Sequence, residues 1–258
     1  MRIFLTGSSG YVGKSIFKAL CDDCDIFPHN RSVFDLTDTK AVTNHFKKNQ
    51  YDVVIHAAAS GGSRLQEDEQ TVLYNNLKSF YNLYDNKHGY NRFITFGSGA
   101  EFSDELTQYS LSKRAINAAI NNTDNFYNIR IYAVFDENEK DTRFIKSCIR
   151  NYLAGNNMVI HQNKYMDFFG MDDLTKLVRL YCTDYNPKKV IDCSYKQKYS
   201  LCDIAEYINS LGTHKSKIDV LTSQIGKSYI GFSDLPPYML FDGLHKSIDK
   251  MFNVMSNQ

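Results

Sequence analysis

The chain opens with Met1-Arg-Ile-Phe-Leu-Thr-Gly-Ser-Ser-Gly-Tyr-Val-Gly13, an apolar run that leads into three glycines spaced three apart. The run at 2–5 predicts a strand, and the segment 14–20 predicts the helix after it. Between such elements, glycines allow a tight turn, close approach of a pyrophosphate to the backbone, and close packing of helix on strand. The stretch therefore predicts a dinucleotide-binding turn with phosphates at the helix N-terminus, against the alternative of a purely structural turn. The expected cofactor contacts here are Gly7, Ser9, Gly10, Tyr11, Val12 and Gly13.

Composition narrows the class of protein. The chain has 258 residues, enough for a large core, and a net charge of +1. That balance indicates neither a basic stripe for nucleic acid nor a surface for an anionic membrane, so we expect no nucleic-acid and no membrane partner. No apolar run approaches the ~18 residues of a membrane span. The first strand begins at once, so no signal peptide is expected.

The six cysteines are scattered along the chain. Cys21 and Cys24 form a CxxC pair, but no second pair or nearby Cys/His cluster completes a zinc site. We therefore expect no metal. Unpaired cysteines of this kind favour a reducing, cytoplasmic compartment.

Short apolar runs alternate with helical segments after the glycine turn. Apolar runs without polar alternation suit a parallel sheet that is covered on both faces, and such a sheet binds ligands beyond the carboxyl ends of its strands. The sequence therefore predicts an α/β fold, a doubly wound parallel sheet of Rossmann type, over 1–145. A smaller, mainly substrate-binding part is expected at 146–258, with segments returning to the sheet. The expected strands are 25–27, 52–56, 92–96 and 128–132, and the expected helices are 41–48, 72–84 and 109–120.

A second motif, Tyr109-Ser-Leu-Ser-Lys113, lies on one of these helices. Residues four apart share a helix face, so the phenol and the ammonium can address one point. A phenol with a pKa of ~10 is a poor acid–base catalyst at neutral pH, and a nearby cation lowers that pKa. Ser98, which follows the strand 92–96, is expected to bind the same substrate oxygen. The pattern predicts a catalytic set, against the alternative of an amphipathic surface helix.

Taken in order, these motifs resemble the extended short-chain dehydrogenase/reductase superfamily, in its NAD-dependent epimerase/dehydratase branch that acts on nucleotide sugars. The resemblance covers nearly the whole chain. The matching segments are 6–13 (TGxxGxxG), Asp35-Leu36 (the adenine-side acidic-apolar pair), 56–59 (HxAA), Asn76, the set Ser98, Tyr109 and Lys113, 130–135 (RxxNVYG-like), 167–174 (RDFxxVDDL-like) and 199–205 (YSxxEIA-like).

The resemblance implies roles for these residues. Tyr109 would exchange a proton with the sugar oxygen, Lys113 would hold the cofactor ribose, and Ser98 would orient the substrate. A homodimer is implied, and the sequence leaves open whether Tyr74, Phe80 or Ile116 face a partner or their own sheet. The further cofactor contacts implied are Asp35, Leu36, Ala57, Ala58, Ala59, Asn76, Phe96 and Tyr132. The substrate contacts implied are Ser60, Ser98, Gly99, Glu101 and Arg143.

The segment Phe27-Pro-His-Asn-Arg31 bears on cofactor choice. NAD enzymes of this type place an acidic residue near here for the ribose 2′-OH, whereas an arginine suits a 2′-phosphate. No carboxylate occurs until Asp35, so Arg31, with Asn30 or His29, is expected to face the phosphate. The sequence favours NADP(H), with NAD(H) and a solvated loop arginine left open.

The residues directly after Ser98 narrow the reaction. Dehydratase members carry an Asp-Glu pair immediately after the triad hydroxyl residue, whereas this chain has Gly99 and Ala100, with Glu101 one position later. The chain most resembles the reductase members, so we expect NADPH-dependent reduction of the C4 keto group of a nucleotide-linked 4-keto-6-deoxy sugar. An NAD-dependent nucleotide-sugar 4-epimerase is the alternative. The non-enzymatic alternative is a cofactor-sensing regulatory protein or a scaffold protein.

Some positions carry two interpretations. Ser98 and Tyr109 are close together for the extended branch, so a substrate-side loop is expected to be missing. Glu101 is either a substrate contact or acid, or an exposed loop glutamate. Arg64, Arg143 and Lys164 are either diphosphate contacts or solvated side chains.

Overall fold

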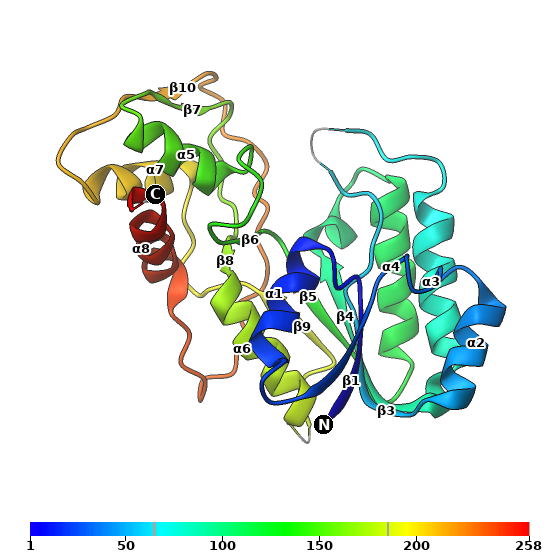
Figure 1. Ribbon diagram of the computed structural model, residues 1–258. Helices are drawn as coiled ribbons and strands as arrows, with labels where there is room; N and C mark the ends of the chain where they lie inside the picture. Colours follow the sequence, from blue (N-terminus) through cyan, green and yellow to red (C-terminus); the bar gives the residue numbers. More distant parts are fainter. Residues whose placement is uncertain (64–65, 185, 258) are drawn as a thin grey trace. The chain divides into compact units, whose positions relative to one another are not determined.

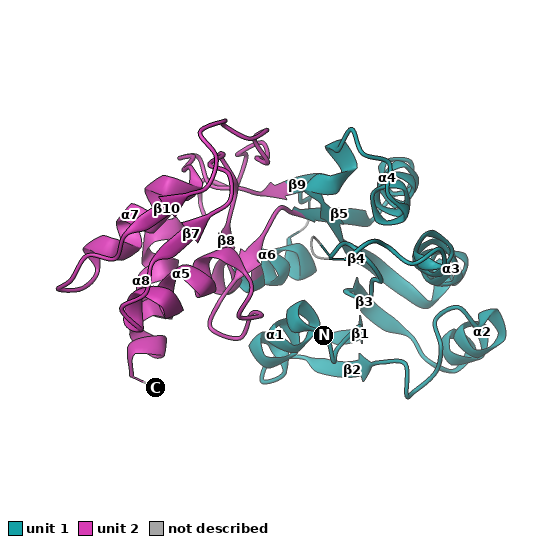
Figure 2. Cartoon of the chain, turned by 90° about the horizontal axis from the view of Figure 1, so that it is seen from above, with its two compact units in different colours: residues 1–130, 175–191 teal, residues 131–174, 192–258 magenta. Residues whose placement is uncertain are grey.

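The computed structural model describes residues 1–63, 66–184 and 186–257. These residues form two compact units (Figure 2). The first unit contains residues 1–130 and 175–191, and the second contains residues 131–174 and 192–258. The chain passes from one unit to the other three times, so neither unit is one continuous stretch.

The first unit is built on a six-stranded sheet in the order β2-β1-β3-β4-β5-β9. β1 pairs in parallel with both β2 and β3, and β3 pairs in parallel with β4. The chain turns to opposite sides of β1 to form β2 and then β3, so the carboxyl ends of β1 and β3 flank the point where the strand order reverses. The strands are β1 (Arg2–Thr6), β2 (Asp25–His29), β3 (Tyr51–His56), β4 (Tyr90–Ser98), β5 (Phe126–Ile131) and β9 (Val190–Cys193).

Helices cover both faces of this sheet. One face carries α2, α3 and α4, and the other carries α1 and α6 (Figures 1 and 2). The predicted doubly wound α/β sheet is therefore confirmed. The helix expected at 14–20 begins at Tyr11, because Gly10 is its N-cap. The helices are α1 (Tyr11–Leu20), α2 (Thr39–Lys48), α3 (Val72–Asp85), η1 (Lys87–Gly89), η2 (Gly99–Phe102), α4 (Gln108–Asn121) and α6 (Met171–Thr183).

Aromatic side chains fill the space between the sheet and α2, α3 and α4. Phe4, Phe46 and Phe80 are fully buried there, and the rings of Phe93 and Phe126 stack with centroids 4.7 Å apart. Phe80 and Ile116 therefore face their own sheet, whereas Tyr74 is 63% exposed. Burial of each large aromatic side chain contributes about 2–3 kcal/mol, so this layer holds α3 and α4 firmly against the strands.

The second unit has its own core. Helices α5 (Phe144–Leu153), α7 (Leu201–Ser210) and α8 (Gly243–Ser256) pack around buried residues that include Ile149, Ile204 and Ile248. Two small parallel sheets complete the unit; they pair β7 (Met158–Ile160) with β10 (Ile218–Val220), and β6 (Val134–Phe135) with β8 (Phe169–Gly170). Among the described residues of both units, no helix combines the length and apolarity that crossing a membrane requires.

Candidate active site

The turn after β1 requires its glycines. Gly7 has φ +68°, and a Cβ there would lie 2.6 Å from the Ala58 nitrogen. A Cβ on Gly13 would overlap the backbone of Gly7, so α1 can approach the turn only with glycine at this position. The N-cap of α1 is Gly10, which has no side chain to occupy the first N–H groups of the helix. The turn thus presents backbone donors and a helix dipole to an anion.

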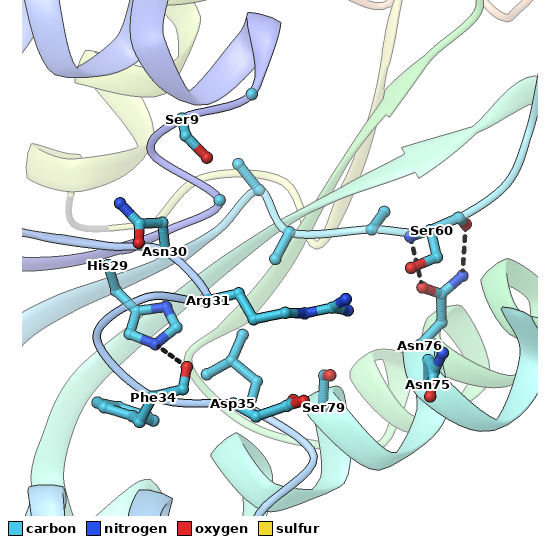
Figure 3. Close-up of a pocket in the computed structure, with 16 residues that line it drawn as sticks. Ser9, His29, Asn30, Arg31, Phe34, Asp35, Ser60, Asn75, Asn76 and Ser79 are labelled. Carbon is cyan, nitrogen blue, oxygen red and sulfur yellow. Dashed lines mark hydrogen bonds between the residues drawn. The ribbon is translucent and has the colours of Figure 1, made fainter. Parts of the chain in front are cut away.

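A cavity of about 240 Å³ lies beside this turn, at the carboxyl ends of β1, β2 and β3 (Figure 3). Its lining includes twelve of the residues predicted to bind cofactor or substrate, then His29, which the sequence offered as an alternative to Asn30, and three that the sequence did not point to. The predicted ones are Gly7, Ser9, Gly10, Asn30, Arg31, Asp35, Leu36, Ala57, Ala58, Ala59, Ser60 and Asn76. The additional ones are Phe34, Asn75 and Ser79.

Arg31 extends into this cavity, whereas Asp35 is held by its own turn (Figure 3). An Asp35 carboxylate oxygen accepts hydrogen bonds from the Thr37 nitrogen (2.8 Å) and hydroxyl (2.9 Å). The Thr37 amide is the main cause of a lowered pKa of Asp35, and the Arg31 charge adds to it. The guanidinium is therefore the main charged group that this side of the cavity presents to an anion.

His29 ends β2 and is 2% exposed. Burial lowers its pKa to about 4, so the ring is neutral at pH 7. Its Nε2 lies 2.9 Å from the Phe34 carbonyl oxygen, which requires the proton to be on Nε2. Nδ1 is then an acceptor that is buried and has no hydrogen-bond partner among the described residues. At the end of β2 the protein therefore places a neutral hydrogen-bond acceptor, and not a carboxylate. A phosphate bound to Arg31 would meet no negative charge from this side chain.

Asn76 on α3 connects the loop after β3 to α4. Its side-chain oxygen accepts a hydrogen bond from the Ser60 nitrogen (2.8 Å). Its amide nitrogen donates to the Ser60 carbonyl and to the Ser112 hydroxyl, both at 3.0 Å. Asn76 therefore fixes the loop that lines the cavity relative to the helix that carries Tyr109.

The structure brings the three predicted catalytic side chains together. Ser98 is the last residue of β4, and its hydroxyl is hydrogen-bonded to the Tyr109 phenol on α4. The Lys113 ammonium donates to the Phe96 carbonyl (2.6 Å) and lies 5.4 Å from the centroid of the Tyr109 ring. α4 presents both residues on one face because they are one turn apart.

The electrostatics of Tyr109 differ from the expectation. Burial raises the pKa of Tyr109, and the Ser98 hydrogen bond opposes that effect only in part. The net direction is the opposite of the expected lowering, because burial outweighs the other contributions and the Lys113 ammonium donates its hydrogen bond to the Phe96 carbonyl. Burial also lowers the pKa of Lys113, to about 8. At neutral pH the pair is therefore a neutral phenol beside a cation.

Glu101 is not an exposed loop glutamate; it is 7% exposed. Its Oε1 accepts a hydrogen bond from the Ser98 nitrogen (3.0 Å), and its Oε2 accepts one from Arg130 Nε (2.9 Å). The exposed-loop alternative is wrong because η2 turns the side chain inward beneath Ser98. The carboxylate is engaged by the protein itself.

Several other predicted residues lie outside the cavity lining, among them Tyr11, Val12 and Gly13 on α1 and Gly99 on η2. Phe96, in β4, is 7% exposed and supplies its carbonyl to Lys113. Tyr132 and Arg143 belong to the second unit, where Tyr132 bonds to an Asp192 oxygen (3.1 Å) and Arg143 Nε lies 3.7 Å from a Glu139 oxygen. Arg64 lies outside the described residues. The cofactor and substrate roles of all these residues stay predictions.

Fold and site together define a Rossmann-type α/β protein with a dinucleotide-binding turn and a Ser-Tyr-Lys set. A model of the NAD dependent epimerase/dehydratase family matches residues 3–193. The chain belongs to this family, which confirms the resemblance and places it in a class of nicotinamide-dependent enzymes.

Individual relatives are more distant. A GDP-L-fucose synthase of Sinorhizobium fredii is 26% identical over 133 residues, which cover 50% of this chain and 42% of that protein. The match thus spans less than half of the curated relative. A GDP-D-glycero-L-gluco-heptose synthase of Campylobacter jejuni, solved in the presence of NADPH, has a TM-score of 0.82 and 14% identity, covering 100% of this chain and 98% of that chain. The UDP-glucuronic acid 4-epimerase of Bacillus cereus, solved with UDP-glucuronic acid and NAD, has a TM-score of 0.77 and 17% identity, covering 100% and 99%.

Proposed function

We propose that the protein reduces the C4 keto group of a nucleotide-linked 4-keto-6-deoxy sugar with NADPH. The observation that carries this proposal is the arrangement of the Tyr109 phenol, which is hydrogen-bonded to Ser98 and has the Lys113 ammonium 5.4 Å from its ring centroid. A reduction needs an acid that gives a proton to the carbonyl oxygen, and a neutral phenol is in the required state. The second unit is proposed to bind the rest of the nucleotide sugar.

The residues present fit a nicotinamide dinucleotide. The glycine turn leaves room for a pyrophosphate against the backbone, and the buried His29 Nδ1 can accept a hydrogen bond from a ribose hydroxyl. Lys113, whose ammonium donates to the Phe96 carbonyl at the end of β4, is proposed to hold the nicotinamide ribose. When bound, the nicotinamide supplies the two electrons of the reduction.

The chain's own groups then carry the proton chemistry. Tyr109 donates its phenolic proton to the carbonyl oxygen while Ser98 donates a hydrogen bond to the same oxygen. The phenolate that remains is stabilised by the Lys113 cation, which lies near the ring. Solvent restores the proton before the next turnover.

Arg31 supports NADPH over NADH. A planar guanidinium binds a phosphate through two parallel hydrogen bonds, and the other charged side chain among the described residues of the cavity lining is the turn-bound Asp35. The Campylobacter jejuni heptose synthase, solved in the presence of NADPH, has a similar fold.

A nucleotide-sugar 4-epimerase is the second candidate. The same Tyr109, Ser98 and Lys113 arrangement can take a proton from the C4 hydroxyl and return it, and the Bacillus cereus 4-epimerase solved with NAD shares the fold. Release of the cofactor from purified protein distinguishes the two. An empty site that prefers NADPH supports the reductase, whereas tightly retained NAD supports the epimerase. Binding of neither cofactor would favour the regulatory or scaffold alternative.

We also propose a homodimer. Tyr74 and Tyr81 lie seven residues apart on α3, and they are 63% and 41% exposed although both are large aromatic side chains. Two turns of helix separate them, so they form a stripe that a second copy could cover. Sedimentation of the wild type and of Tyr74→Ser tests this: the proposal expects a dimer that weakens in the variant, and a monomeric wild type contradicts it.

A further inference from the structure

Glu101 closes the turn that presents Ser98. Ser98 is the N-cap of η2, and its hydroxyl oxygen accepts a hydrogen bond from the Ala100 nitrogen (3.2 Å). The Glu101 side chain reaches back and accepts one from the Ser98 nitrogen (3.0 Å). This reciprocal arrangement is a capping box, and it determines both the backbone and the side-chain orientation of Ser98.

The same carboxylate is anchored from β5. Arg130 Nε donates to Oε2 at 2.9 Å, with side-chain exposures of 9% for Arg130 and 3% for Glu101. Asn128 Nδ2 lies 3.3 Å from Oε1. Gly97 leaves room for the carboxylate, because a Cβ there would overlap Oε1. The Phe102 ring covers Arg130, 4.5 Å from the guanidinium carbon. Two strands and one short helix therefore hold Glu101 in one place.

Burying an ion pair of this kind costs desolvation free energy. Removing two charges from water costs as much as their attraction returns, or more, so an apolar pair would stabilise the fold equally well. A glutamate that only capped η2 would not need to be buried against an arginine. The carboxylate accepts a hydrogen bond from the Ser98 nitrogen and acts electrostatically on Tyr109 and Lys113. This position indicates a role in the active site.

We propose that Glu101 is a positioning residue of the proton-transfer set, which holds Ser98 in reach of Tyr109 and supplies the negative charge that balances Lys113. The inference rests on the proposed reductase function and adds Glu101, with Arg130 as its anchor, to the residues that function needs. It replaces the interpretation of Glu101 as an acid that touches the substrate.

The groups that face Lys113 come from three elements. Tyr109 lies on its own helix, Glu101 on η2, and His56 on β3. Burial lowers the pKa of His56 to about 3, so this ring is neutral at working pH. Arg130 on β5 is paired with Glu101. Glu101 is thus the negative group acting on Lys113, and its charge opposes the burial that lowers the Lys113 pKa to about 8.

The test replaces Glu101 by glutamine. Glu101→Gln keeps an oxygen that can accept from the Ser98 nitrogen but removes the charge. We expect kcat to fall roughly tenfold or more while the KM for NADPH changes less than about twofold. Since Lys113 then loses its proton more readily, the alkaline limb of the kcat profile should move down by about one pH unit. Glu105→Gln, on the exposed part of the same loop, is the matched control and should leave both unchanged.

The single variant leaves Arg130 buried without its partner, which can prevent folding. The double variant Glu101→Gln/Arg130→Met removes both charges and keeps the volume, so it should restore the melting temperature. The proposal expects the double variant to fold as the wild type does but to keep the low kcat and the shifted pH profile. A folded double variant with the wild-type kcat and pH profile would show a purely structural role and overturn the inference.

A titration without substrate separates this inference from the proposed function. NMR of protein carrying ¹³C-labelled lysine, with Lys113 assigned through Lys113→Arg, follows the ammonium directly. The inference expects the Lys113 titration midpoint to lie lower in the double variant than in the wild type. An unchanged midpoint contradicts it, whether or not any keto sugar is reduced. If only the proposed function is wrong, the wild type will reduce no keto sugar, but the Lys113 titration midpoint will still be lower in the double variant than in the wild type.

Discussion

Two turns at the carboxyl edge of the same sheet, one after β1 and one after β4, are built in different ways. The β1 turn depends on local backbone sterics: Gly7 takes a positive φ, and Gly13 lets α1 pack against it. The β4 turn depends on side chains distant in sequence, with Glu101 beneath Ser98 and Arg130 reaching in from β5. We propose that the first turn binds the cofactor and that the second positions the residues of the proton transfer. A turn that depends on local backbone sterics can be predicted from the spacing of its glycines. A turn that is held by side chains distant in sequence cannot be predicted in this way.

The largest effect on kcat is expected at Tyr109, whose phenol is hydrogen-bonded to Ser98 of the β4 turn. Tyr109→Phe removes only the oxygen that transfers the proton, so kcat should fall by about 10³-fold. Binding of NADPH, followed by fluorescence, should stay within about twofold because the β1 turn is untouched. Turnover that survives in the variant would remove Tyr109 from the mechanism.

A change in the β1 turn should act on folding and binding instead. Gly13→Ala forces a methyl group into the Gly7 backbone and should destabilise the protein by about 2–3 kcal/mol, measured by urea unfolding. Gly10→Ala is the matched control, since its Cβ would lie 3.3 Å from the Gly7 oxygen and needs only a small shift. It should cost less than about 1 kcal/mol of stability and yet weaken NADPH binding, because the methyl lies where the pyrophosphate approaches. Equal destabilisation by the two variants would contradict the steric argument.

Cofactor choice gives a third, smaller effect. Arg31→Ala removes a charge-assisted hydrogen bond worth about 1.5–3 kcal/mol, so NADPH affinity should fall about 10- to 100-fold. NADH, which lacks the 2′-phosphate, serves as the internal control and should lose little affinity. Calorimetric titration of both cofactors checks this, and similar losses for the two would place the 2′-phosphate elsewhere.

The smallest effect concerns pH. Lys113 has a pKa of about 8, so it is charged below that pH and neutral above it. Since the cation stabilises the phenolate that forms on Tyr109, kcat should fall as pH rises through about 8. Circular dichroism over the same range controls for unfolding. A kcat that rises through this range would indicate that the neutral amine is the active form.

Much of the fold and part of the site can be predicted from sequence patterns. Alternating apolar and helical segments predict the sheet because each run must be buried on both faces. Tyr109 and Lys113 can be predicted to lie together because they are one helix turn apart. Ser98 can be predicted to lie near them because it ends the preceding strand. These features depend on short stretches of chain.

The features that the sequence did not indicate depend on packing. The raised pKa of Tyr109 reflects its burial, to which Gly62 contributes: a Cβ on Gly62 would lie 2.9 Å from the phenol ring. His29 lines the cavity because β1 and β2 pair in register, with Thr6 beside His29, and the segment 27–31 alone did not decide between His29 and Asn30. Glu101 is buried because Arg130, far along the chain, faces it. Nothing near Glu101 in the sequence indicates that Arg130 will bury it.

The most direct test of the proposed function is a single-turnover assay with the purified protein, NADPH and a nucleotide-linked 4-keto-6-deoxy sugar, in which the NADPH oxidised and the C4 alcohol formed are both measured. We predict one alcohol formed for each NADPH oxidised, and neither product with Tyr109→Phe. No oxidation of NADPH, together with NAD retained through purification and interconversion of C4 epimers, would contradict the reductase assignment.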